Sequence, residues 1–316
     1  MATKHFNKLV TEIIDTYAES QIVHANSLIL TIFGDFVSAH GGTIWLGSLI
    51  KLVSRLGINQ RLVRTSVFRL TEKGILQSKQ VGRRSFYSLT DKGFRQYSSA
   101  AERIYRYHDY KWNGEWCLVF TTLENLAKKD RERFQNELIW LGFNRLANGV
   151  YAHPLVALEE VHKVVKEMSL EDSVVVMQSR SSGDESLIAS GNLIKSSFNV
   201  YAMKEEYQEH IDFFKGVLKS AESSAQKSDE ACFLIRLLLI HKYRRILMRE
   251  PEIPHELMPA ECLSHEAREI TERLYKLICN QAEDYFMETA ESESVNLPEV
   301  NAEYFTRFGG IPPMNG

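Results

Sequence analysis

Four helices are predicted near the start of the chain from the spacing of its apolar residues. Apolar side chains recur three or four positions apart, on one face of a helix, in residues 6–18, 25–39, 45–57 and 60–74. Thr43 can cap the third helix and Asn59 the fourth, because a side-chain oxygen at the cap accepts a bond from a backbone N–H of the first turn. Gly57 and Gly74 are typical of helix ends.

The pattern changes after Gly74 from helical spacing to two short strands. The segments ILQSKQ and SFYSLT flank the turn VGRR, which predicts a β-hairpin. A further helix is expected from Asp91 to His108, before a polar stretch that ends at Gly114. We place the first domain boundary after residue 108.

The middle of the chain alternates strands and helices. We expect strands at 115–123, 148–154 and 172–179, separated by helices at 127–142 and 155–168. This order favours a small α/β sandwich with a split βαβ arrangement. Trp140 and Phe143 are expected to pack in its core. The Gly- and Ser-containing segment SRSSGDES marks the next boundary.

The rest of the chain is predicted to be mainly helical. Long amphipathic stretches cover residues 186–223, 229–249 and 264–288. The sequence therefore predicts a mixed α+β protein of three consecutive domains, at residues 1–108, 109–183 and 184–316.

Charge is distributed unevenly along the chain, although the net charge is only −3. Residues 43–106 hold 13 lysines and arginines against three acids, whereas residues 107–316 hold 23 against 34. The positive field is thus concentrated in one segment, where the phosphates of a polyanion would bind. The acidic remainder should limit indiscriminate binding.

The fourth predicted helix has an apolar face and a cationic face. At 100° per residue, the apolar side holds Leu62, Val63, Ser66, Val67 and Leu70, and the other side holds Arg61, Arg64, Thr65, Phe68 and Arg69. A helix that follows a tight turn and presents Gln60, Arg61 and Arg64 near its start resembles a recognition helix in the major groove of DNA. A solvated surface helix is the alternative.

The turn of the predicted hairpin adds a second basic element. Gly82 allows a tight turn, so Arg83 and Arg84 project from its tip. Helix, turn, helix and basic hairpin, in that order, are typical of a winged helix-turn-helix. We predict DNA contacts from Gln60, Arg61, Arg64, Thr65, Arg69, Arg83 and Arg84.

Segments along nearly the whole chain resemble one protein family. In order they are WLGSLIKLVSRLG, RLVRTSVFRLTEKGIL, VGRRSFYSLTDKG, NELIWLGF, LLLIHKYRR, PEIPHELMP and YFTRFGG. They look like those of the PaaX family, the repressors of phenylacetic acid degradation operons. The resemblance implies a cytoplasmic homodimer with a winged-helix domain, a ferredoxin-like middle domain and a helical effector-binding and dimerisation domain. It also implies release from double-stranded operator DNA by phenylacetyl-coenzyme A.

A candidate effector site lies in the segment ACFLIRLLLIHKYRRILMR. Given the resemblance, its polar residues could hold the phosphates of the thioester, because guanidinium groups bind phosphate oxygens bidentately. These residues are Arg236, His241, Tyr243, Arg244 and Arg245. In the structural alternative, Arg236 pairs with a buried acid and the basic cluster stabilises the C-terminus of its helix.

The sequence lacks the common enzyme motifs. GxSxG, GxxxxGK[ST], HExxH and a GxGxxG between strand and helix are absent, and we expect no cofactor or metal. The four cysteines stand far apart, which indicates reduced core residues, with a redox sensor as the alternative. We expect neither a signal peptide nor a membrane-spanning segment.

Two other functions stay open from the residues alone. A nucleic-acid-processing enzyme could be built on the middle domain, but a metal-dependent nuclease needs grouped carboxylates, and only Glu115 precedes the first strand there. A scaffold whose basic segment binds RNA is the third hypothesis. Metal-dependent cleavage would favour the enzyme, and preference for unstructured RNA over duplex DNA would favour the scaffold.

Overall fold

The computed structural model gathers the chain into two compact units. Unit 1 comprises Met1–Tyr107, Glu205–Met248 and Leu263–Gly316, and unit 2 comprises His108–Lys204 and Arg249–Cys262. The residues described are 3–20, 24–105, 112–122, 127–154, 158–180, 186–198, 200–201, 203–250, 253–259, 261–293 and 297–311.

The three consecutive domains expected from the sequence differ from these two units. The predicted ends at residues 108 and 183 lie outside the described residues. The physical reason for the difference is that the long C-terminal helices pack on helices near the N-terminus and share a single core with them.

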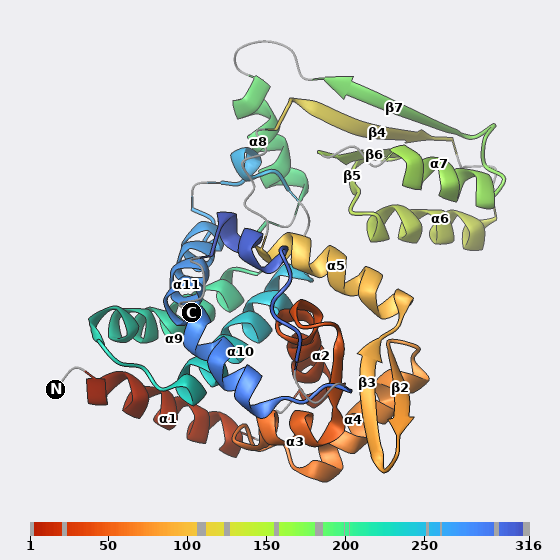
Figure 1. Ribbon diagram of the computed structural model, residues 1–316. Coiled ribbons are helices and arrows are strands. Elements are labelled where there is room, and N and C mark those ends of the chain that lie inside the picture. Colours follow the sequence, from red (N-terminus) through yellow and green to blue (C-terminus); the bar gives the residue numbers. More distant parts are fainter. Residues whose placement is uncertain are drawn as a thin grey trace. The chain divides into compact units, whose positions relative to one another are not determined.

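The N-terminal part of unit 1 consists of helices and a small sheet (Figure 1). The helices are α1 (Thr3–Glu19), α2 (Ala25–Asp35), α3 (Leu46–Ser54), α4 (Gln60–Glu72) and α5 (Asp91–Tyr105). The strands are β1 (Thr43–Trp45), β2 (Leu76–Val81) and β3 (Arg84–Leu89). They form an antiparallel sheet in the order β1-β3-β2, so the predicted hairpin is confirmed.

Two of the predicted helix caps have different outcomes. The Asn59 cap is confirmed, since its side-chain oxygen accepts a bond of 2.9 Å from the N–H of Leu62. The Thr43 cap is wrong, because Thr43 pairs with Ser88 in the sheet and α3 begins only at Leu46. Sheet pairing with a strand more than 40 residues later gave this segment a partner that local spacing does not reveal.

The C-terminal part of unit 1 is built from three long helices and a 3₁₀ turn. These are α9 (Lys204–Ser223), α10 (Asp229–Leu247), α11 (Ser264–Thr289) and the turn Tyr304–Gly309. Every residue of α10 from Ala231 to His241 is buried, so this helix is apolar on nearly all sides because it is central. It packs on α11 and on α2. No helix among the described residues has both the length and the apolarity to cross a bilayer.

Unit 2 contains a four-stranded antiparallel sheet. Its elements are β4 (Glu115–Thr121), α6 (Lys128–Trp140), β5 (Asn144–Ala147), β6 (Val150–His153), α7 (Leu158–Glu167), β7 (Val174–Arg180) and α8 (Ser186–Ser197). The strand order is β5-β6-β4-β7, and α6 and α7 cover one face (Figure 1). This β-α-β-β-α-β order confirms the split βαβ arrangement.

Some details of unit 2 differ from the sequence prediction. Strand β5 was not predicted, because four residues with a bulge give no clear alternation. The helix predicted over 186–223 ends at Ser197, since Phe198 and Val200 are buried against Trp116 in a second apolar cluster. Phe143 is in the core as predicted, and the side chain of Trp140 lies outside the described positions.

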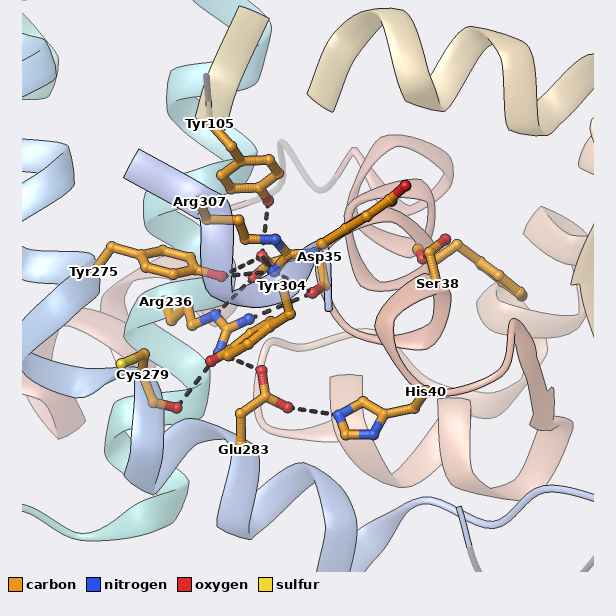
Figure 2. A network of polar contacts seen from close by, with 12 residues as sticks. Asp35, Ser38, His40, Tyr105, Arg236, Tyr275, Cys279, Glu283, Tyr304 and Arg307 are labelled. Carbon is orange, nitrogen blue, oxygen red and sulfur yellow. Dashed lines mark hydrogen bonds and ion pairs between the residues drawn. The ribbon is translucent and has the colours of Figure 1, made fainter. Parts of the chain in front are cut away.

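A buried ion pair connects α2 with α10 in unit 1 (Figure 2). Nε of Arg236 donates to Asp35 at 2.8 Å, and Nη1 of Arg236 donates to Glu283 at 2.7 Å. Glu283 also accepts from Nε2 of His40 at 2.8 Å, while Nδ1 of His40 lies 2.7 Å from the carbonyl oxygen of Pro298. Both ring nitrogens of His40 thus lie within hydrogen-bond distance of oxygen atoms. The side chains of Asp35, Arg236, Glu283 and His40 are fully buried.

Three further donors converge on Asp35. Its Oδ1 accepts from the hydroxyls of Tyr105 and Tyr275 at 2.7 and 2.9 Å, and from Nη1 of Arg307 at 3.0 Å. The guanidinium of Arg236 also stacks 4.2 Å from the ring of Phe36. Elements α2, α5, α10, α11 and the C-terminal turn therefore meet at one carboxylate (Figure 2).

The pKa values of Glu283 and Arg236 are shifted by the groups that surround them in this network. Burial alone would raise the pKa of Glu283, but Arg236 and His40 lower it below its ordinary value. Burial opposes the charge of Arg236, and Asp35, Tyr275 and Glu283 raise its pKa well above the usual value. Both shifts favour the charged forms of Arg236 and Glu283, and each of these charges depends on a partner.

Two other buried histidines in unit 1 are neutral. Burial, and to a lesser extent the positive charge of Lys242, lowers the pKa of His210 to about 3. Burial, and to a lesser extent the positive charges of Arg244 and Arg245, lowers the pKa of His241 to about 3. One nitrogen of each ring, Nδ1 of His210 and Nε2 of His241, has no hydrogen-bond partner in the part of the chain that is described.

We expect Glu283→Gln to lower the free energy of unfolding by about 3–5 kcal/mol, because it leaves Arg236 with an incomplete set of partners in the core. Urea denaturation followed by circular dichroism measures the loss. Arg273→Ala, which removes exposed ion pairs on α11, is the control and should leave the transition in place. An unchanged midpoint for Glu283→Gln would show that the network contributes little to the stability of the fold.

The neutral histidines predict loss of stability in mild acid. Their folded pKa lies below the unfolded value near 6.5, so their contribution is fully present above about pH 6.5 and is lost as pH falls toward 3. Each adds a slope of at most about 1.4 kcal/mol per pH unit. The double change His210→Gln and His241→Gln should flatten the stability profile between pH 6.5 and 4, whereas His5→Gln, at an exposed position, should not. Equal slopes in all three proteins would contradict this.

Candidate nucleic-acid interface and effector site

The two predicted faces of α4 are separated by their exposure to solvent. The buried side holds Val63, Ser66, Val67 and Leu70, and the exposed side holds Gln60, Arg61, Arg64, Phe68 and Arg69. Phe68 is 61% exposed, which is unusual for a phenylalanine. Burial of one side anchors the helix, and the other side is available for contact.

Hydrogen bonds within α4 arrange some of its polar side chains. The side-chain oxygen of Gln60 accepts from Nε and Nη2 of Arg64 at 3.2 and 3.0 Å. The hydroxyl of Thr65 donates to the carbonyl oxygen of Arg61 at 2.9 Å, so it is satisfied inside the helix. Arg64 is thereby oriented by a neighbour, while Thr65 retains only acceptor capacity.

The hairpin turn places its two arginines in different surroundings. Gly82 has a φ of +59°, a conformation that glycine adopts without strain. Arg83 is exposed and makes no hydrogen bond or ion pair with the residues described. Arg84 forms an ion pair with Glu291, and its guanidinium lies 4.5 Å from the ring centroid of Trp45.

An acidic segment after α11 lies against the hairpin, which the sequence did not indicate. Glu291 pairs with Arg84, and Glu293 pairs with Lys79. The same segment is held to the sheet because the N–H of Trp45 donates to the carbonyl oxygen of Glu291 at 2.8 Å. The carboxylates are more than 200 residues from their partners, so no local signal could have revealed the contact.

The candidate effector residues of α10 do not form one surface. Arg236 is in the buried network, which confirms the structural alternative that it pairs with a buried acid. His241 and Tyr243 are buried, and the ring of Tyr243 lies 5.4 Å from that of His210. Arg245 is exposed. Arg244, half-buried, donates through Nη2 to the carbonyl oxygen and the hydroxyl of Ser27 at 2.9 and 2.7 Å.

A cavity of about 80 Å³ in unit 1 is lined by Arg244. Its lining comes from α2, α5 and α10, from Ile75 just before β2 and from Leu89 at the end of β3. The apolar residues that line it are Leu30, Ile75, Leu89, Ala100, Ile104 and Ile240. Of the predicted effector residues, Arg244 alone lines this cavity.

The described residues include no exposed cysteine and no group of side chains that could hold a metal ion. All four cysteines are buried, and burial raises the pKa of Cys232 to about 12, the opposite of a reactive thiol. No cluster of three or more His, Cys, Asp or Glu side chains that could share a metal ion occurs in the described part of the chain. Glu115 bonds to Asn113 and Gln178.

Family models match three consecutive parts of the chain. Residues 24–93 match a PaaX-like protein, residues 109–189 match the PaaX protein central Cas2-like domain, and residues 198–288 match the PaaX-like protein C-terminal domain. These segments extend over most of the sequence and follow the order of the motifs described above.

Whole proteins give the same result. The transcriptional repressor PaaX of Escherichia coli (strain K12) is 34% identical over 303 residues, which cover 94% of this chain and 95% of that protein. Its description is that of a regulator and not of an enzyme. The solved structure of the uncharacterized protein Rv0674 from Mycobacterium tuberculosis shares the fold, with a TM-score of 0.53 at 18% identity over 83% of this chain and 98% of that one. The present chain therefore belongs to the PaaX family.

Proposed function

We propose that this protein is a homodimeric transcriptional repressor of phenylacetate catabolism genes that phenylacetyl-coenzyme A releases from its operator. The observation that carries the proposal is the exposed polar face of α4, in a strongly basic segment of a chain whose relative is a repressor. A mobility-shift assay on the promoter of its own operon, with and without phenylacetyl-coenzyme A, tests both parts of the proposal.

In this proposal α2, α3, α4 and the sheet β1-β3-β2 act as a winged helix-turn-helix. The start of α4 enters the major groove, where Gln60, Arg61 and Arg64 contact base edges. Arg69 and the turn residue Arg83 contact phosphates on either side. Thr65 accepts a bond from a base or from water, since its own proton is used within the helix.

The wing cations have two possible partners in this proposal. Arg84 and Lys79 pair with Glu291 and Glu293 in the free protein, so DNA phosphates must compete with two carboxylates. Exposed ion pairs of this kind are weak, and a phosphate can replace the carboxylate at small cost. The acidic segment thereby reduces non-specific affinity more than specific affinity, because non-specific binding depends mainly on charge.

Coupling between effector and DNA follows from the shared core of unit 1. Helix α10 packs on α2, and α2 packs on α4, so a displacement of α10 reaches the DNA-binding face through two packed contacts. Of the residues first considered for the effector, we retain His241, Tyr243, Arg244 and Arg245 as candidates, and we assign Arg236 to the structural network.

The exposed position of Arg64 predicts a loss of specific affinity on truncation. Arg64→Ala should weaken operator binding by about 1–3 kcal/mol and leave the melting temperature unchanged. Fluorescence anisotropy with operator and scrambled duplexes measures the effect. Arg133→Ala, at an exposed position of α6, is the control. If operator affinity stays the same, Arg64 does not contact a base.

The ion pairs of the acidic segment predict a gain of affinity when the acids are neutralised. Glu291→Gln with Glu293→Gln should strengthen binding to any duplex and make its salt dependence steeper, because Arg84 and Lys79 become free for phosphates. Arg83→Ala should instead make the salt dependence shallower. The slope of the logarithm of the binding constant against the logarithm of the salt concentration should fall by about one. Weaker binding by the glutamine variant would indicate that the acids support the wing rather than compete for it.

A further inference from the structure

The cavity beside Arg244 combines apolar walls with an incompletely paired cation. Nη2 of Arg244 bonds only to neutral oxygens of Ser27, and its Nε is buried without a partner in the described structure. No carboxylate among the described residues lies within ion-pair distance of this guanidinium. A partly buried cation without an anion is costly, and a ligand oxygen would remove part of that cost.

The other charged groups near the cavity are already paired. Asp35 lines it, but its oxygens accept from Arg236, Arg307 and two tyrosine hydroxyls. The Tyr105 hydroxyl is one of these donors. Arg244 therefore differs from the other ionised groups of the cavity in retaining an unused donor.

The position of the cavity connects it to the base of the hairpin. Ile75 precedes β2 and Leu89 ends β3, and both line the cavity together with Gly93 of α5. These residues are closely packed, since a Cβ on Gly93 would collide with the carbonyl oxygen of Ile75. The hydroxyl of Thr90 donates to the carbonyl oxygen of Gly74 at 2.6 Å, which fixes the hairpin to the end of α4.

We propose that this cavity binds the acyl end of an organic acid derivative, with Arg244 donating to the carboxylate or thioester oxygen and the apolar walls enclosing the acyl chain or ring. The proposal rests on the function proposed above, and it identifies where the effector acts. The oxygen satisfies the free Nε–H of Arg244. The apolar group replaces the contacts that the cavity walls lack.

Size limits what the cavity can hold. Its volume of about 80 Å³ is smaller than the roughly 150 Å³ of an engineered cavity that binds benzene. It accommodates one small apolar group, with slight adjustment of its walls, and excludes the nucleotide of a coenzyme A thioester. Any nucleotide stays outside, so a free acid and its thioester share the same contacts in the cavity.

In this scheme, a ligand bound in the cavity displaces the hairpin. A group inserted between Leu89, Ala100 and Ile240 separates α5 and the hairpin base from α10. The hairpin and α4 are fixed to each other through Gly74 and Thr90, so the DNA-binding elements shift as one body. A ligand that fits only the shifted arrangement lowers DNA affinity by its preference for that state.

The test compares one cavity-filling variant and one cation variant with a matched control. Ala100→Leu occupies the cavity, Arg244→Met removes the cation, and Lys219→Ala removes an exposed charge of α9 as the control. Ser27→Ala removes the hydroxyl partner of Arg244, keeps its carbonyl partner and lies outside the cavity lining. Calorimetry of the full-length protein uses phenylacetyl-coenzyme A, phenylacetate and coenzyme A as separate probes, without DNA.

We expect Ala100→Leu and Arg244→Met each to raise the dissociation constant of the bound probe by about tenfold or more, with Lys219→Ala and Ser27→Ala close to wild type. Arg244→Lys should recover part of the affinity, which separates a binding role from a folding role. Binding of phenylacetate alone would identify the free acid as the occupant, and binding of the thioester alone would show that contacts outside the cavity are also needed.

Folded Ala100→Leu and Arg244→Met variants that bind the probe as well as wild type would overturn the cavity assignment alone. The proposed function fails by a different result, namely a wild-type protein that binds none of the three probes or does not bind its operon promoter in a mobility-shift assay. A repressor released at the same effector concentration in all variants would retain its function and lose this site.

Discussion

Asp35 and Arg236 form an ion pair that is fully removed from solvent, and the arrangement of unit 1 depends on it. Taking two such charges out of water costs several kcal/mol per ion, so the pair is stable only where other donors and acceptors complete it. Tyr105, Tyr275 and Arg307 do so for the carboxylate, and Glu283 does so for the guanidinium. Five elements are thereby oriented by directional bonds and not by apolar packing alone.

This constraint explains why the N- and C-terminal parts of the chain fold as one unit. Asp35 ends α2, and α2 packs on both α4 and α10. An apolar interface can slide by a few tenths of an ångström, but a carboxylate with several donors has one favourable position. Movement of α10 must therefore carry α2 with it or break buried bonds, which suits a two-state response better than a gradual one.

Electrostatics acts differently at the surface of the same unit. The cations of the hairpin pair with Glu291 and Glu293 in a partly exposed setting, where such pairs are weak and sensitive to salt. Contacts of this strength can exchange partners without affecting the fold. The chain thus uses strong, satisfied charges in the core to fix the architecture, and weak, replaceable charges at the surface where a polyanion would bind.

The sequence by itself determined the elements and faces that depend on neighbours along the chain. The Asn59 cap, the two sides of α4 and the hairpin turn at Gly82 follow from local geometry and from the 3.6-residue period. Its motifs also identified the family, and its charge distribution located the candidate DNA-binding segment.

Contacts between distant parts of the chain were decided only in the tertiary structure. Thr43 joined a sheet instead of capping a helix because its partner, Ser88, comes much later in the sequence. Arg236 and Arg244 both lie on α10, yet one is paired with two carboxylates and the other lines a cavity with an unused donor. Periodicity assigns a residue to a side of its helix, but the charge it meets there depends on the element that packs against that side.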